Sequence, residues 1–409
     1  MVSGRARRKN NAEICGQPAR RAGSDIMQEN NTAPLRVAQI LGKMNGAGIE
    51  QVVMNYYEAI DRSRIQFDFY VSSSSRHIPA EEIKSMGGGL YLMCGFKMPL
   101  RYLRTLTEQL RRNHYDIVHC HLGTLSFIPL LAATRAGVPV RILHNHTTSG
   151  GKREFIRNMA KAMFRPFAKM FATERFACSW HAARWIYGRV PVVVIGETVP
   201  KNAAVVLRNA IDISKFRFDA GKRTSARREF GIASGTLLFG HVGRFCPQKN
   251  QHFLIDIFAR IVKQHPNSRL MLVGEGADME VIRARIITAG LAGKVILAGQ
   301  RSDVDRLYSA MDCFILPSNY EGLGMVGIEA QCAGLPCLFS DKVPREVKIT
   351  PMAQFLSLKT SAEDWAFAAI NLARTKRRDA SAEAAAEGYD INVEAEKLAE
   401  YYLKLSGYV

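Results

Sequence analysis

The chain has 409 residues, 47% of them apolar, which is enough to bury large hydrophobic cores and predicts two globular domains rather than one. Lysine and arginine outnumber aspartate and glutamate by 56 to 37, a formal net charge of +19, and such a positive field favours anionic partners. Because no RNA- or DNA-binding signature accompanies the dispersed basic residues, we expect a phosphorylated substrate or an acidic membrane surface, and no nucleic acid.

Residues 1–34 are basic and polar and contain no apolar run, so they resemble neither a signal peptide nor a transmembrane anchor. We expect a disordered basic tail, with Met27 as a candidate for the true start. The eight cysteines form no C-x-x-C pair, and we expect them to be free thiols in a reducing cytosol.

From residue 35 onwards, short apolar runs alternate with longer segments of helical period, which is typical of parallel α/β structure. The expected strands are 36–41, 67–71, 116–119, 140–143, 176–178 and 192–195, and the expected helices are 49–60, 99–113, 125–136 and 153–172. We predict that residues 35–208 form one doubly wound, Rossmann-like domain.

A second alternating series follows the polar stretch 219–228. Its expected strands are 237–242, 269–273, 294–298, 312–316 and 336–339, and its expected helices are 250–264, 277–289, 303–310 and 325–333. We therefore predict a second Rossmann-like domain over 209–392 and a central cleft between the two domains, where small-molecule sites are usual. Residues 393–409 are expected to form a helix that packs back across the domains.

The first strand leads into a glycine-containing loop with Gly46 and Gly48, just before a helix. Glycines there let the backbone approach a ligand, and a helix N-terminus offers unpaired amides to a phosphate. The loop matches neither a Walker motif nor a G-x-G-x-x-G fingerprint, and taken alone a glycine pair here more often makes a tight turn.

Two histidine pairs stand at predicted strand ends, His119 with His121 and His144 with His146. Residues two apart on a strand face one side, so four imidazoles can gather at one edge. A zinc site is conceivable, but no acidic or cysteine ligand completes it, and strand-end histidines often bond to backbone or water. We predict no metal.

Two cations, Arg244 and Lys249, lie on the loop after strand 237–242, with Gly243 immediately before the arginine. A guanidinium binds two phosphate oxygens at once and an ammonium acts as a mobile point charge, so the pair suits a diphosphate. A solvated surface loop is the alternative interpretation.

Two carboxylates, Glu321 and Glu329, stand eight positions apart around the start of helix 325–333. The position suits hydrogen bonds to sugar hydroxyls beside the carboxyl edge of a sheet. The alternative is a helix cap plus a surface glutamate, but the combination with the other loops favours a site.

Together these segments resemble the retaining glycosyltransferases of family 4, two-domain enzymes of the GT-B fold, and more closely their bacterial capsule and exopolysaccharide members. The resemblance covers about residues 35–405. It rests on NGAGIEQVV, DIVHCHLGTLSFIPLLAA with GVPVRILHNH, VLRNAIDISKF, GHVGRFCPQKN, and the E-x7-E pattern with AGLPCLFSD.

The resemblance implies roles for the matching positions. Arg244 and Lys249 would hold the nucleotide diphosphate, Glu329 the ribose hydroxyls, and Glu321 the donor sugar, with His121 near the reacting face. The implied donor-binding set also includes Gly46, Gly48, Gly243, Gly322, Leu323 and Gly324, and the implied acceptor-side set is His119, His144 and His146.

The implied reaction moves a sugar from a nucleoside diphosphate, expected to be a UDP-sugar, to a saccharide or lipid-linked saccharide, with the anomeric configuration kept. It needs no metal and no cofactor. Three positions, Arg208, Asn209 and Ala210, replace the usual Pro-Asn-Gly, which leaves the linker geometry open. Ala47 and Gly324 are smaller departures.

Residues 151–176 combine seven cations with interleaved apolar residues. At helical spacing, such a segment suits an anionic membrane surface, and packing of its apolar stripe into the domain is an equal alternative. We expect a cytoplasmic protein, at the cytoplasmic face of the inner membrane if the first interpretation holds. The rival functions are a sugar-nucleotide epimerase, a phosphorylase, and a non-catalytic basic binding protein.

Overall fold

The computed structural model describes residues 33–44, 48–146 and 155–408, and of residues 155–162 only the backbone. The predictions for the tail up to residue 32, for Gly46 and Ala47, and for the beginning of the basic segment 151–176 lie outside the described residues. The seven described cysteines are free thiols.

The N-terminal half forms a sheet of eight parallel strands in the order β3-β2-β1-β4-β5-β6-β8-β7. The first six follow the order of a Rossmann sheet, whose chain reverses direction between β1 and β4. The strands are β1 (Leu35–Ile40), β2 (Ile65–Ser72), β3 (Leu90–Met93), β4 (Ile117–Cys120), β5 (Val140–Asn145), β6 (Glu174–Ala177), β7 (Val192–Val194) and β8 (Ala204–Val206).

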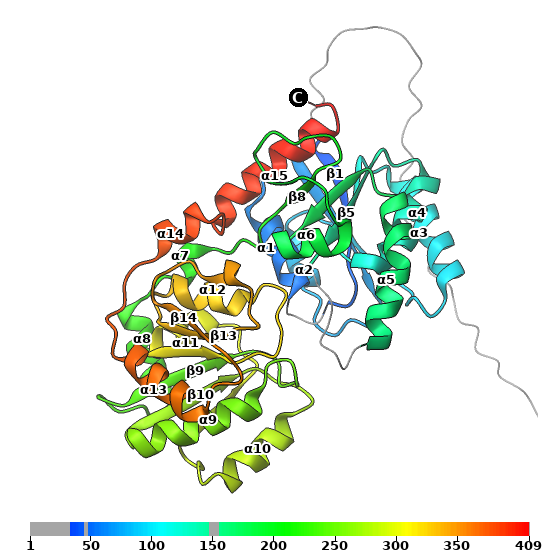
Figure 1. Cartoon of the computed structure of the whole chain (residues 1–409). Helices are drawn as coiled ribbons and strands as arrows, with labels where there is room; N and C mark the ends of the chain where they lie inside the picture. Colours follow the sequence, from blue (N-terminus) through cyan, green and yellow to red (C-terminus); the bar gives the residue numbers. More distant parts are fainter. Residues whose placement is uncertain (1–32, 45–47, 147–154, 409) are drawn as a thin grey trace, which may run out of the picture. The chain divides into compact units, whose positions relative to one another are not determined.

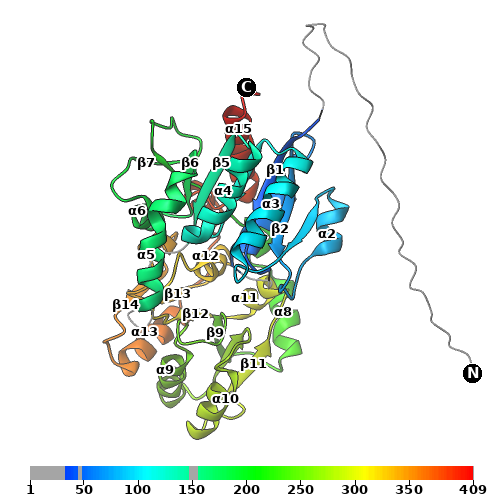
Figure 2. The ribbon, with the colours of Figure 1, turned by 90° about the vertical axis from the view of Figure 1, so that its right-hand side faces the viewer.

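Helices cover both faces of this sheet. On one face α3, α4 and α5 lie side by side (Figures 1 and 2), and on the other α1 and the C-terminal helix α15 share a core with the strands. The helices of this half are α1 (Ile49–Ala59), α2 (Ala80–Ser85), α3 (Pro99–Asn113), α4 (Phe127–Ala136), α5 (Phe155–Met170) and α6 (Trp180–Tyr187), with a 3-10 turn η1 (Gly123–Ser126).

The C-terminal half repeats the plan with six parallel strands in the order β11-β10-β9-β12-β13-β14. This is again the Rossmann order, with its reversal between β9 and β12, where Phe314 pairs with Gly240. The strands are β9 (Leu237–Val242), β10 (Ser268–Val273), β11 (Val295–Gly299), β12 (Cys313–Leu316), β13 (Cys337–Ser340) and β14 (Ala353–Leu356).

The helices of the second half alternate with its strands. They are α7 (Ile213–Phe216), α8 (Ala220–Glu229), α9 (Gln251–Gln264), α10 (Met279–Thr288), α11 (Val304–Ala310), α12 (Met325–Cys332), α13 (Ala362–Ala373) and α14 (Ser381–Ala386), with a 3-10 turn η3 (Arg345–Val347). The polar stretch 219–228 proves to be helix α8, capped by the Asp219 side chain, which accepts from the Lys222 N–H.

The last helix, α15 (Ile391–Leu405), is capped by Asp390, whose side chain accepts a hydrogen bond from the Asn392 N–H. Its buried residues Leu398 and Tyr402 belong to the core of the first sheet. A parallel bridge between Ile211 and Asp390 brings the entry of this helix beside the chain that leaves the first sheet. The prediction of a returning C-terminal helix is confirmed.

The fold prediction, two doubly wound parallel sheets, is confirmed, and every predicted strand and helix exists within a few residues of its expected position. The sequence prediction missed β3, β8, β14, α2, α6, α7, α8, α13 and α14. Most of these lie at sheet edges or are short, so their apolar patterns are weak. The domain boundary at residue 208 stays a prediction; β8 ends at Val206 and β9 starts at Leu237.

Candidate active site

The two predicted cations lie on the loop that follows β9. This loop is at the carboxyl ends of the strands, where the strand order of the second sheet reverses. Lys249 Nζ donates to Glu321 Oε1 at 2.7 Å, and the two side chains are only 14% and 6% exposed. Arg244 is exposed. The alternative of a solvated surface loop therefore fits Arg244 but not Lys249.

Glu321 is held by three donors. Besides Lys249, the Ser318 hydroxyl donates to Oε1 at 2.6 Å and the Gln248 amide donates to Oε2 at 3.2 Å. A carboxylate this enclosed is not the helix cap or surface glutamate of the alternative interpretation. The structure brings the predicted cation and carboxylate together.

Asparagines tie the loop after β9 to the loop after β12. The Asn319 N–H donates to Gln248 O at 2.8 Å and its side chain donates to Pro247 O at 2.7 Å. Asn250, in the left-handed region at φ 55°, donates from its side chain to Pro317 O at 3.1 Å. These bonds fix the spacing between the lysine and glutamate loops.

Two glycines, Gly243 and Gly276, allow the backbone and side chains of the lysine loop to pack closely. A Cβ on Gly276 would lie 2.2 Å from Phe245 O, and one on Gly243 would lie 3.0 Å from Lys249 Cε. Gly243 thus leaves the space across which the Lys249 side chain runs. This is a direct reason for glycine at the position preceding Arg244.

Glu329 lies in the second turn of α12, which starts after Gly324 in the left-handed region at φ 91°. The Tyr308 hydroxyl donates to Glu329 Oε2 at 2.9 Å. Burial raises the pKa of Glu329, while the Tyr308 hydrogen bond and the charge of Lys249 oppose the shift. Leu323 is buried in the core of this half, and Gly322 approaches the other half, since its Cβ would lie 3.1 Å from His146 O.

The four histidines gather at the ends of β4 and β5, as their spacing predicts. His119 bonds through Nδ1 to the Tyr402 hydroxyl at 2.5 Å and through Nε2 to His144 Nδ1 at 3.0 Å. His121 bonds to Gln39 Oε1 at 2.8 Å and to His146 Nε2 at 2.9 Å. Burial lowers the pKa of all four imidazoles, that of His146 to about 3, so they are neutral at physiological pH.

Three of these imidazoles, His119, His121 and His144, have ligand atoms within 4.8 Å of one another, close enough for a metal ion. Both ring nitrogens of His119 and of His121 already take part in hydrogen bonds with side chains. The network accounts for these histidines as a packed, hydrogen-bonded array rather than the backbone or water contacts we expected. The absence of a metal requirement stays a prediction.

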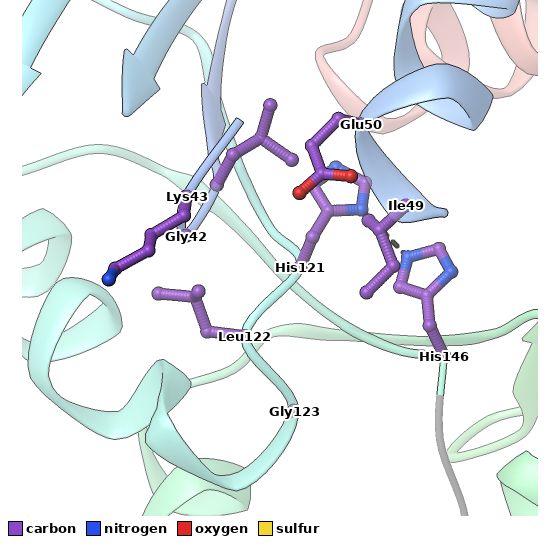
Figure 3. Close-up of a pocket in the computed structure, with 9 residues that line it drawn as sticks. Gly42, Lys43, Ile49, Glu50, His121, Leu122, Gly123 and His146 are labelled. Atoms are coloured by element: carbon purple, nitrogen blue, oxygen red, sulfur yellow. Dashed lines mark hydrogen bonds between the residues drawn. The ribbon is translucent and has the colours of Figure 1, made fainter. Parts of the chain in front are cut away.

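A pocket of about 230 Å³ opens beside this array (Figure 3). Its lining comes from the ends of β1, β4 and β5 and the start of α1, where Gly48 precedes the helix at φ 76°. The lining residues are Leu41, Gly42, Lys43, Ile49, Glu50, His121, Leu122, Gly123 and His146. Of the predicted acceptor-side histidines, His146 lines the pocket, whereas His119 and His144 are not among its lining residues.

Sequence reasoning missed several residues of the site. Glu50 follows the predicted glycine loop directly and could have been found as the only acid in the first turn of α1. Tyr308, Gln248 and Asn319 carry no sequence signal, because their roles depend on partners far along the chain.

Comparisons with known proteins agree with the fold. The family model "Glycosyltransferase Family 4" matches residues 46–214, and "Glycosyl transferases group 1" matches residues 222–387. HepE of Anabaena, solved in complex with UDP and glucose, has a TM-score of 0.72 at 17% identity, over 90% of this chain and 100% of that chain. This likeness shows the fold alone.

Relatives extend over nearly the whole chain. EpsF of Bacillus subtilis, a protein assigned to the glycosyltransferases, is 31% identical over 368 residues, 88% of this chain and 94% of that protein. The capsular polysaccharide biosynthesis glycosyltransferase CapH of Staphylococcus aureus is 23% identical over 90% of this chain and 99% of that protein. With two family models matching in order and a relative this similar, the chain belongs to the family 4 glycosyltransferases of the GT-B fold.

Proposed function

We propose that the protein transfers a sugar from a UDP-sugar to a hydroxyl of a saccharide or lipid-linked saccharide during the synthesis of a cell-surface polysaccharide, with retention of the anomeric configuration. The observation that carries this proposal is the enclosed Lys249–Glu321 pair beside Glu329 and the start of α12. The names of HepE, bound to UDP and glucose, and of CapH, in capsule biosynthesis, support the donor and the pathway.

The chemistry asks for positive charge beside the leaving group. When the bond between the sugar and the diphosphate breaks, negative charge grows on the diphosphate, and fixed cations stabilise that charge more than they stabilise the bound donor. Lys249 and Arg244 would supply it, together with the N–H groups at the start of α12. With these donors, the reaction needs no metal, and chelators should leave it unchanged.

Preorganisation is what the loop contacts contribute. The Lys249 ammonium already has its carboxylate partner, and that partner has two further donors, Ser318 and Gln248. A group held in place before the donor binds costs little reorganisation during the reaction. Glu329, fixed by Tyr308, would bind the ribose hydroxyls in the same manner.

Substitution of the lysine tests the proposal. We expect Lys249→Ala to keep its fold but to lose transfer by about two to three decades, by analogy with removal of one oxyanion donor. The matched control is Lys263→Ala on the exposed side of α9. The measurement is the release of UDP from UDP-sugars with and without a saccharide acceptor; wild-type turnover by folded Lys249→Ala, or UDP release that never depends on an acceptor, would remove the proposed role.

We further propose that the helices α3, α4 and α5, which cover one face of the first sheet, rest on an anionic membrane surface. On α5, Met163, Phe167 and Met170 are 61%, 47% and 66% exposed at positions i, i+4 and i+7, so they share one face. Phe164 instead stacks on Phe127 at 5.2 Å, so the apolar residues divide between the core and the surface. Each of our two interpretations describes one side of this helix.

Helix α3, which packs against α4 next to α5, adds support to the membrane proposal. Leu100 is 81% exposed there, beside Lys97, Arg101 and Arg104. Exposed apolar side chains among cations are what an anionic interface binds. No helix in the described part of the chain is long and apolar enough to cross a membrane.

Liposome flotation tests the membrane contact. We expect binding to vesicles with anionic lipid that falls as salt rises, and weaker binding after the triple change Met163→Ser, Phe167→Ser and Met170→Ser. The exposed apolar pair Val281 and Ile287 on α10, changed to serine, is the control. Binding that ignores lipid charge, or that the triple variant keeps in full, would contradict the proposal.

A further inference from the structure

Glu50 is a further candidate for a binding residue. Its carboxylate belongs to the pocket at the ends of β1, β4 and β5, and no part of the donor argument uses it. Every residue that lines this pocket comes from the N-terminal half, whereas the diphosphate loops belong to the C-terminal half. The pocket therefore offers room for a molecule other than the nucleotide.

The pocket adjoins the donor loops. The backbone oxygen of His146, a lining residue, would lie 3.1 Å from a Cβ on Gly322, in the loop that carries Glu321. The positive charge of Arg244 also acts on Glu50. A molecule in the pocket would thus lie next to the donor, where an acceptor must lie.

The chemistry of the lining fits one face of a sugar ring and its hydroxyls. Leu41, Ile49 and Leu122 form apolar walls against which the C–H groups of a pyranose can pack. Glu50 offers oxygen acceptors, and Figure 3 shows its carboxylate and the His121 ring together in the pocket. A carboxylate can accept two hydroxyl hydrogen bonds at once.

The charge of the pocket lining restricts which sugars can bind there. Among the described residues, Glu50 forms no ion pair within 4.0 Å, and the two imidazoles of the lining are neutral. The other charged lining residue, Lys43, is exposed and extends away from Glu50 (Figure 3). Of the lining residues, Glu50 thus makes the inner part of the pocket negative, while Arg244 belongs to the donor loop that would face the diphosphate. A sugar carboxylate or phosphate there would meet a like charge in partly desolvated surroundings.

We infer that Glu50 binds the hydroxyls of the acceptor's terminal sugar and restricts that sugar to a neutral one, excluding uronic acids and sugar phosphates. The inference rests on the proposed function, since it names the acceptor class of that site. Glu50 is a binding and specificity residue here, and the bond-breaking step does not pass through it.

The test compares matched neutral and acidic sugars on the full-length protein saturated with UDP. Methyl β-glucoside and methyl β-glucuronide form one pair, and methyl β-galactoside and methyl β-galacturonide the other, with binding measured by ligand-observed NMR. We expect the wild type to bind at least one neutral sugar about tenfold more tightly than its acid, which corresponds to about 1.4 kcal/mol. Glu50→Gln should reduce the ratio to below about threefold.

Two further variants make the result specific. Glu50→Ala should weaken the neutral sugar by about tenfold because it removes the hydrogen-bond acceptors. Glu58→Gln, an equal charge change on the exposed side of the same helix, should leave the ratio unchanged.

Several outcomes would overturn the inference. These are equal binding of acid and neutral sugar by the wild type, binding of neither pair, or a ratio that Glu50→Gln leaves intact. A loss of UDP affinity in Glu50→Gln of more than about threefold would also overturn it, because Glu50 would then serve Arg244 rather than the acceptor. Failure of the wild type to bind UDP would instead strike the proposed function, and the sugar pairs could still be compared without nucleotide.

Discussion

At the scale of single residues, the Glu329 carboxylate owes its orientation to Tyr308, whose hydroxyl donates to Oε2 at 2.9 Å. Lys249, Glu321 and Glu329 are identifiable from spacing, because the E-x7-E pattern and the loop after a strand are local features. The tyrosine that orients Glu329 is not, since Tyr308 lies 21 positions away and reads as an ordinary core aromatic. Residues whose role is to hold another residue become visible only once the chain has folded.

Tyr308→Phe should weaken recognition of the ribose. The substitution removes the donor to Glu329 Oε2 and leaves the ring in the core, so the carboxylate loses its orientation but not its charge. A hydrogen bond to a charged group contributes roughly 1.5 to 3 kcal/mol, so we expect the KM for donor to rise by about tenfold or more. Steady-state kinetics, with kcat and KM resolved, is the measurement.

A second readout separates orientation from general loosening of the fold. If Tyr308 acts through Glu329, Tyr308→Phe should also lose most of its preference for a ribose donor over the 2′-deoxyribose analogue. Phe314→Leu, a change in the same core that does not touch Glu329 directly, serves as the comparison. An unchanged preference in Tyr308→Phe, with only the melting temperature lowered, would assign the tyrosine a structural role.

At the scale of elements, both sheets place their candidate site residues at the point where the strand order reverses. In the second sheet, the loops after β9 and β12 carry Lys249 and Glu321, and neighbouring loops support them through the backbone. The residues 274–276 after β10 are the clearest support, since Gly274 and Gly276 lie directly against Gly243 and Phe245.

Gly276→Ala should therefore displace the loop that carries Lys249, although Gly276 itself is not a site residue. The added Cβ would lie 2.2 Å from Phe245 O and 2.7 Å from Phe245 N, and backbone atoms cannot move aside without displacing the loop that carries Lys249. Overpacking of this kind costs typically 1 to 3 kcal/mol, and we expect a lower melting temperature together with transfer reduced by about tenfold or more. Gly95→Ala, where a Cβ would meet nothing within 4 Å, is the control, and equal behaviour of the two variants would refute the argument.

The four buried histidines at the ends of β4 and β5 predict how the stability of the protein depends on pH. The pKa values of His119, His121, His144 and His146 are lowered by burial, so these residues stay neutral in the native protein while the unfolded chain protonates its histidines below about pH 6.5. The unfolded state then binds more protons, and stability falls as pH falls, by about 1.4 kcal/mol per pH unit for each such residue.

The expected observation is a melting temperature that drops steeply between pH 7 and 5. His144→Gln should melt lower than the wild type at pH 7.5 but lose less on acidification, because one neutral histidine has been removed from the native state. The exposed His77→Gln should keep the full slope. A slope that His144→Gln does not reduce would show that the buried array is not the source.

For the whole molecule, the sequence predicts the repeated α/β plan because parallel strands buried on both faces appear as apolar runs that stand out from helical segments. It does not predict the short strands β3 and β14 at the sheet edges or β8 next to an edge, nor the helices that join the second half to α15. The carboxylate and cation loops are predictable for the same local reason as the strands. The pocket around Glu50 is not, since it depends on three strand ends that are consecutive in space and not in sequence.

Arg208, the first of the three residues that replace the usual Pro-Asn-Gly, makes side-chain contacts in the structure that a proline could not make. It follows β8, and its guanidinium donates to Glu346 Oε2 at 3.1 Å, with side chains 11% and 16% exposed. The same guanidinium lies over the ring of Tyr389 at 5.6 Å, and Tyr56 donates to the Arg208 backbone oxygen at 2.7 Å. One residue thus joins α1 and the end of the first sheet to η3 beyond the second sheet's strand β13.

The pair should therefore act as a coupled unit between the two halves of the chain. Glu346→Gln leaves a poorly solvated guanidinium without its ion-pair partner, and Arg208→Met leaves the carboxylate with His181 at 2.8 Å as its remaining ion-pair partner among the described residues. Each variant should therefore melt several degrees lower. The double variant should lose less than the sum of the two losses, because the second change removes a charge that the first has already left unpaired. Strictly additive losses would show that the two side chains are neighbours without being coupled, and the Pro-Asn-Gly replacement would then need another cause.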